Sequence, residues 1–95
     1  GSEMCIRDSF SGANIDSTGA LKNTTATDDD GAANVELALV HDDKVLDLAT
    51  DSPEAEVTAS GVATYAMQAR YRKAGVDAPV AGSFTTSVGV DVTHE

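Results

Sequence analysis

The chain has 95 residues, a net charge of −10 and only 4% aromatic residues, so it has room for one small domain with a thin core. The acidity argues against nucleic acid and anionic membranes as partners, because both attract basic surfaces. No apolar run approaches the roughly 18 residues of a membrane-inserted span, and Cys5 has no second cysteine for an internal disulfide. The abundance of Val, Thr, Ala, Gly and Asp favours strands and turns over helices.

The first nine residues differ in character from the rest of the chain. Residues 4–9 read M-C-I-R-D-S, which resembles the translation of a transposase-end adapter used in DNA sequencing. We therefore expect residues 1–9 to be a non-native, adapter-derived segment and residues 10–95 to be the natural domain, truncated before Phe10. The alternative is that the first residues form an ordinary N-terminal strand.

A loop and a hairpin follow. Residues 11–31 have the composition of a loop, and residues 34–40 then alternate in a way that predicts a strand with one apolar face. The predicted core residues on that face are Val35, Leu37 and Leu39, opposite Asn34, Glu36 and Ala38. A polar four-residue loop at residues 41–44 and a short strand at residues 45–48 complete the predicted hairpin. A helix is the rival interpretation because some apolar positions also fit helical spacing, but the short runs favour strands.

A second strand region lies in the middle of the chain. A turn at residues 51–54 and a brief edge strand at residues 57–59 precede a longer alternating run at residues 62–71. The predicted core residues of this run are Tyr65, Met67, Ala69 and Tyr71. Residues 72–82 are predicted as a long polar loop, because they contain two glycines and a proline.

The last element has the clearest pattern. Two alternating sets of residues run from Phe84 to His94, which predicts a strand longer than is typical. One face of this strand carries Phe84, Thr86, Val88, Val90, Val92 and His94. A long strand with an apolar face needs a neighbour on each side, because an unpaired edge invites aggregation.

No group of residues in the sequence predicts catalysis, a cofactor or a metal site. His41 and His94 are far apart and lie outside any cluster with ligand spacing. The run D-D-D-G at residues 28–31 lacks the spacing and the downstream glutamate of a calcium loop, which favours a solvated acidic loop. No serine stands in a nucleophile motif. We therefore expect a protein that is not an enzyme.

Four segments, taken in order, resemble a known family. They are F-S-G-A-N-I-D at residues 10–16, N-V-E-L-A-L-V-H-D-D with V-L-D-L within residues 34–48, A-T-Y-A-M-Q-A-R-Y at residues 63–71 and P-V-A-G-S-F-T-T-S-V-G-V-D-V-T-H-E at residues 79–95. Together they resemble the C-terminal two-thirds of a chaperone–usher (type 1 fimbrial) major pilin. The resemblance implies an all-β fold, an incomplete immunoglobulin-like sandwich that lacks its final strand and, in this chain, early strands as well.

The resemblance also implies a function. In that family a periplasmic chaperone, and then the next subunit, donates a strand to the gap beside the C-terminal strand. This implies a structural subunit of an extracellular fimbria of a Gram-negative bacterium, with a pilus chaperone, an outer-membrane usher and neighbouring pilins as partners. The implied donor-strand groove and subunit interface consists of Phe84, Thr86, Val88, Gly89, Val90, Val92 and His94. The chain departs from the family in having His94 in place of a tyrosine, and in lacking the family's cysteine pair and N-terminal donor segment.

Two other functions remain as alternatives. One is a minor or tip pilin, or the pilin domain of an adhesin, with the same fold at another position in the fibre. The other is an unrelated extracellular β-sandwich that acts as a binding module, with calcium as a candidate stabilising ion. Only this second alternative predicts a complete fold that unfolds cooperatively without a donated strand.

Overall fold

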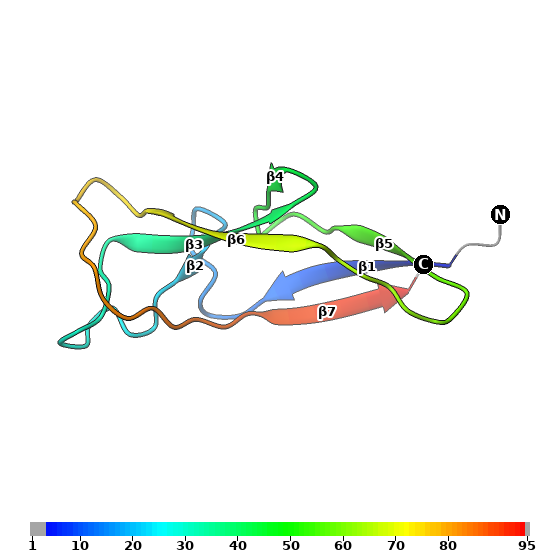
Figure 1. Cartoon of the computed structure of the whole chain (residues 1–95), viewed down its shortest axis with the longest axis horizontal. Coiled ribbons are helices and arrows are strands. Elements are labelled where there is room, and N and C mark those ends of the chain that lie inside the picture. Colours follow the sequence, from blue (N-terminus) through cyan, green and yellow to red (C-terminus); the bar gives the residue numbers. More distant parts are fainter. Residues whose placement is uncertain (1–3, 95) are drawn as a thin grey trace.

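The computed structural model describes residues 4–94, which form seven β-strands and no helix (Figure 1). The strands are β1 (Met4–Ser11), β2 (Leu21–Lys22), β3 (Val35–His41), β4 (Lys44–Val45), β5 (Glu54–Val57), β6 (Met67–Lys73) and β7 (Gly89–His94). The predicted all-β class is therefore confirmed. Within this part of the chain, no helix is long and apolar enough to cross a membrane.

The strands form two antiparallel sheets in a small sandwich-like fold. One sheet has the order β5-β1-β7, and in the other β3 pairs with β2, β4 and β6. Because β6 pairs along the whole of β3, the two short strands β2 and β4 share the other edge of β3. The two sheets are displaced along the long axis of the molecule, which measures 52 × 21 × 20 Å (Figure 1).

β1 is the central strand of its sheet, with β5 on one side and β7 on the other. Phe10 packs against the core, and the period of two places Ile6 on the same face. Residues 4–9 supply most of this paired strand, as the alternative of an ordinary N-terminal strand predicts. Residues 1–3 lie outside the described residues, and the adapter origin of the segment remains a prediction.

The β3–β4 hairpin turns through two residues, Asp42 and Asp43, and not through the predicted four. Both have positive φ, 51° and 62°, as a type I′ turn requires. His41 pairs with Lys44 directly across the turn. The predicted loop was too long because polar side chains at the end of a strand do not show where backbone pairing stops.

The buried core is small and lies around β2 and the residues that follow β4. Its centre is a cluster of three leucines, Leu21, Leu46 and Leu48. The partly buried residues that pack against this cluster are Phe10, Ile15, Leu37, Leu39, Met67 and Val88. Two other predicted core residues, Val35 and Tyr65, are half-buried. On β3 the buried residues are Glu36, Ala38 and Val40, whereas the predicted core residues Val35, Leu37 and Leu39 are half-buried. The prediction also differs from the structure at Ala69 and Tyr71, which are exposed. Both lie on β6, which pairs with β3 alone, so their side chains stand at the margin of the sheet.

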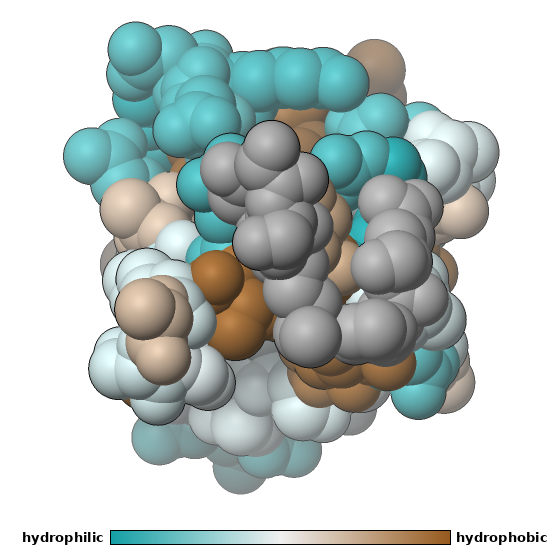
Figure 2. Space-filling model, turned by 90° about the vertical axis from the view of Figure 1, so that its right-hand side faces the viewer, coloured by the Kyte–Doolittle hydropathy of each residue, from teal (hydrophilic) through white to brown (hydrophobic). Residues whose placement is uncertain are grey.

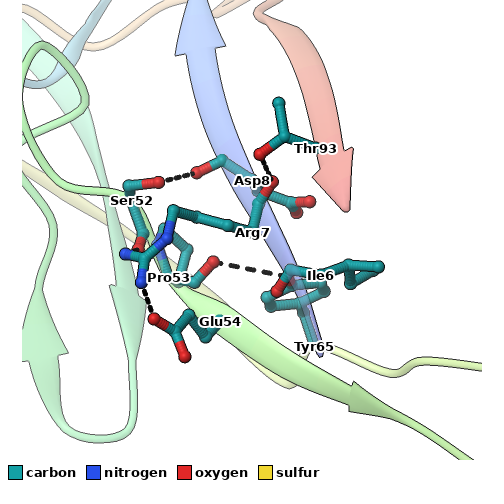
Figure 3. Close-up of polar contacts among 8 residues, drawn as sticks. All are labelled: Ile6, Arg7, Asp8, Ser52, Pro53, Glu54, Tyr65 and Thr93. Atoms are coloured by element: carbon teal, nitrogen blue, oxygen red, sulfur yellow. Dashed lines mark hydrogen bonds and ion pairs between the residues drawn. The ribbon is translucent and has the colours of Figure 1, made fainter. Parts of the chain in front are cut away.

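The middle strands begin and end at other residues than predicted. β5 begins at Glu54, inside the predicted turn, and β6 extends to Lys73, inside the predicted polar loop. Residues 58–66 connect the two strands, and residues 62–66, predicted as the start of the longer strand, are not paired in a ladder. Their one aromatic residue, Tyr65, directs its hydroxyl to the carbonyl oxygen of Ile6 at 3.4 Å (Figure 3). This contact explains the half-burial of Tyr65 outside a strand.

Candidate functional site

The predicted groove residues follow one another along the end of the chain, but only part of them form a strand. Residues 89–94 form β7, whereas residues 84–88 are extended without belonging to a ladder. His94 lies in β7 opposite Ile6, and its side chain lies outside the described residues. The predicted eleven-residue strand is therefore shorter in the structure.

Loop side chains replace a neighbouring strand on one edge of residues 84–88. The Asn23 side-chain oxygen accepts a hydrogen bond from the Thr85 amide at 2.9 Å, and the Thr24 amide donates to the Thr85 carbonyl at 2.8 Å. The Asn14 side-chain amide donates to the Ser87 carbonyl at 3.0 Å. Asn23 is itself buried and also donates to Ala32. These contacts pair the backbone groups of the odd-numbered residues Thr85 and Ser87, and they attach one edge of residues 84–88 to the rest of the molecule.

The other edge is open. Among the described residues, no hydrogen bond is found for the backbone groups of Phe84, Thr86 or Val88, and β7 pairs with β1 alone. We call residues 84–92 with this unpaired side the open edge. Such an edge presents free N–H and C=O groups to any extended chain that approaches it.

The open edge also has an apolar face that is only partly covered. Phe84, Thr86 and Val88 are half-buried, whereas Val90 is 50% exposed and Val92 is 60% exposed. Val90 lies across from Phe10 of β1, and Phe10 packs against the core. The two valines therefore share the inward face of the sheet, at a margin that no described segment covers. Figure 2 views the end of the molecule where this sheet lies and shows hydrophobic surface among hydrophilic residues.

A pocket of about 440 Å³ lies at the Phe84 end of the open edge. The rings of Phe84 and Tyr71 meet edge to face with their centroids 5.1 Å apart, and Tyr71 is 67% exposed. The remaining lining is apolar and small: Ala32, Val35, Pro79, Val80, Ala81 and Gly82. Its apolar lining suits a large apolar side chain.

Thr86, in the middle of the first half of the open edge, carries a buried hydroxyl without a hydrogen-bond partner. Burying a hydroxyl without a partner is unfavourable, and native structures contain few such groups. The sequence pattern placed Thr86 on the apolar face but gave no sign that its hydroxyl would be unpaired.

Gly89 lies where β7 and β1 approach each other closely. A Cβ atom at this position would lie 2.9 Å from the Ser11 side-chain oxygen and 3.1 Å from the Ser11 carbonyl oxygen. Glycine therefore permits the close approach of β1 on the paired side. This contact lies within the sheet, on the side of β7 that pairs with β1.

Polar side chains fix β1 between its neighbours (Figure 3). Arg7 pairs with Glu54 and donates to the Ser52 carbonyl at 3.1 Å. The Ser52 hydroxyl donates to the Asp8 carbonyl at 2.6 Å, and the Thr93 hydroxyl donates to the Arg7 carbonyl at 3.1 Å. The Thr93 contact joins β7 to β1, and the other contacts join β1 to β5 and to the residue pair before it.

Tyr65 and Asp51 have shifted pKa values. Burial raises the pKa of Tyr65, and the nearby carboxylate of Asp8 raises it further. The Asp47 amide, which donates to the Asp51 carboxylate at 2.8 Å, lowers the pKa of Asp51. Burial opposes this shift, and Lys44 adds to it. Neither group lines the pocket beside Phe84, so neither predicts acid–base chemistry there.

The arrangement is suited to binding an extended chain. In residues 4–94 no group of three or more His, Cys, Asp or Glu side chains is placed to hold a metal ion. His41 contacts the Ala66 carbonyl at 3.2 Å through its Nδ1 atom and stacks at a tilt on Tyr65. No protein-family model matches the chain, and a comparison with curated proteins finds no match.

Proposed function

We propose that this chain is a structural subunit of an extracellular bacterial fimbria, a shaft pilin that polymerises by accepting a donated strand. The observation that carries the proposal is the open edge, a nine-residue segment with an unpaired side and an apolar face that is only partly covered. Strand addition uses both features, because main-chain hydrogen bonds supply affinity and alternate side chains supply register.

The size of the molecule supports an incomplete fold. Its radius of gyration is 15.7 Å, whereas a compact domain of this length has a value of about 12 Å. Only seven apolar residues among those described are buried. A sandwich with so little core gains much from a further strand that covers its inward face.

The proposed assembly is head to tail. A subunit that receives a strand at one surface and donates a strand from another forms an open filament and not a closed ring. Before assembly, the same edge needs protection from aggregation. A periplasmic pilus chaperone fits this need, and an outer-membrane usher and neighbouring pilins complete the proposed partners.

Titration with a synthetic strand tests the proposal. A peptide of about nine residues, with an apolar residue at every second position, matches the length of the open edge at a rise of about 3.3 Å per residue. We expect it to bind the full chain saturably and to raise the melting temperature. A peptide of the same composition in scrambled order is the control.

Two matched substitutions locate the binding site. Val90→Lys places a charge on the open edge and should weaken binding, whereas Val76→Lys makes the same change at a residue that is 91% exposed in a loop and should leave binding unchanged. If the chain melts cooperatively and does not bind the peptide, the proposal is overturned and the independent β-sandwich is favoured.

A further inference from the structure

The starting observation is the Thr86 hydroxyl, which is buried and unpaired in the middle of an otherwise apolar row. Its neighbours on the same face, Phe84 and Val88, offer no hydrogen-bonding side chain. The odd-numbered neighbour Thr85 directs its backbone groups to Asn23 and Thr24, on the side opposite the open edge. Nothing among the described residues therefore satisfies this hydroxyl, at a cost that a partner could remove.

A strand added at the open edge would bring side chains to this position. Residues directly opposite one another on adjacent antiparallel strands have Cβ atoms about 4.5–5.5 Å apart, which is within reach of a hydroxyl pair. Cross-strand Thr–Thr and Thr–Ser hydrogen bonds are a known source of sheet stability. The residue opposite Thr86 is thus the group best placed to pair with its hydroxyl.

We propose that Thr86 sets the register of the incoming strand by selecting a hydroxyl side chain, Ser or Thr, at the inward position opposite it. The inference rests on the proposed function, since it concerns the strand that the open edge accepts. The other inward positions of that strand face Phe84, Val88, Val90 and Val92 and are apolar. The preferred partner is therefore an alternating strand whose inward row is interrupted by one hydroxyl.

An inward row made only of apolar residues does not define a single pairing register for the incoming strand. A slip of one residue turns every inward side chain outward and is strongly disfavoured, but a slip of two residues keeps the apolar face inward. Thr86 removes this ambiguity, because a slip of two places an apolar group on its hydroxyl and buries the donor's hydroxyl against a valine or phenylalanine. Both errors leave a buried polar group unpaired.

The test uses the full chain and a set of alternating peptides of about nine residues. One peptide has valine at every inward position, and the others have a single threonine that moves along the inward row in steps of two. We expect one threonine position to bind wild type roughly tenfold more tightly than the others. In Thr86→Val, an isosteric change, that preference should disappear and the all-valine peptide should bind best.

Thr85→Val is the matched control, because Thr85 is the adjacent, exposed residue on the opposite face. It should keep the wild-type ranking of the peptides. If the peptides bind but Thr86→Val leaves their ranking unchanged, the role of Thr86 is wrong and the proposed function stands. If no alternating peptide binds wild type, the proposed function fails, and this inference fails with it.

Discussion

Glu36 is a buried carboxylate on β3, and its charge is held by Arg72 of the neighbouring strand. The Arg72 Nε atom lies 2.7 Å from one carboxylate oxygen, and the Thr18 hydroxyl donates to the other at 2.6 Å. The Glu36 side chain is 4% exposed, whereas that of Arg72 is 39% exposed. Satisfied in this way, Glu36 joins the loop before β2 to the sheet.

Removing the cation should therefore be costly. Arg72→Met leaves the Glu36 charge buried and unpaired, and we expect a loss of about 3 kcal/mol in the free energy of unfolding. Arg70→Met, on the same exposed face of β6, should cost less than about 0.5 kcal/mol. Urea unfolding compares the two variants, and equal losses would show that Glu36 does not depend on Arg72.

Tyr65 gives the stability a dependence on alkaline pH. Burial and the Asp8 carboxylate raise its pKa above the ordinary value of 10.0, so the folded chain favours the neutral phenol more than the unfolded chain does. The contribution of Tyr65 to the free energy of unfolding is therefore complete below about pH 10, the pKa of the unfolded state. It is lost as the pH rises through the higher pKa of the folded state. Melting curves between about pH 8 and 11 should show this fall in wild type and a smaller one in Tyr65→Phe. Tyr71→Phe, at an exposed ring, should behave as wild type.

The β3–β4 hairpin carries a local strain that can be relieved. Asp42 and Asp43 both adopt the left-handed conformation, which glycine and asparagine enter more readily. The double change Asp42→Asn, Asp43→Gly should raise the free energy of unfolding by up to about 1 kcal/mol. Asp77→Gly, at a loop residue without positive φ, should give no gain in the same urea experiment.

The sequence pattern located strands better than it located their ends. A period of two is strong in β3, β6 and β7, so these elements were predicted at or near their places. Residues 84–88 look like strand in the sequence because their side chains alternate, yet their partners are the loop side chains of Asn14 and Asn23. No local pattern identifies such partners.

The candidate site was partly predictable for the same reason. Alternation placed Val90 and Val92 on one face, and the structure gives them an uncovered margin. Burial depends on what covers a strand, and the sequence does not show it, so Tyr71 was predicted as core and lies exposed at a pocket. Whether the Thr86 hydroxyl finds a partner also depends on segments that are distant in the sequence, so no local pattern predicts that it is unpaired.

At the scale of the whole molecule, the open edge predicts that a strand supplied within the same chain will complete the fold. An alternating strand attached after Glu95 by a short Gly/Ser linker can turn back beside β7 and run along residues 84–92. The linker keeps the strand at a high effective concentration. Covering Val90 and Val92 should raise the melting temperature by about 4–8 °C for each kcal/mol gained. The urea m value should rise as well, because more surface is buried in the folded state. A scrambled strand on the same linker should change neither quantity, and an equal effect of both strands would show that the edge does not recognise alternation.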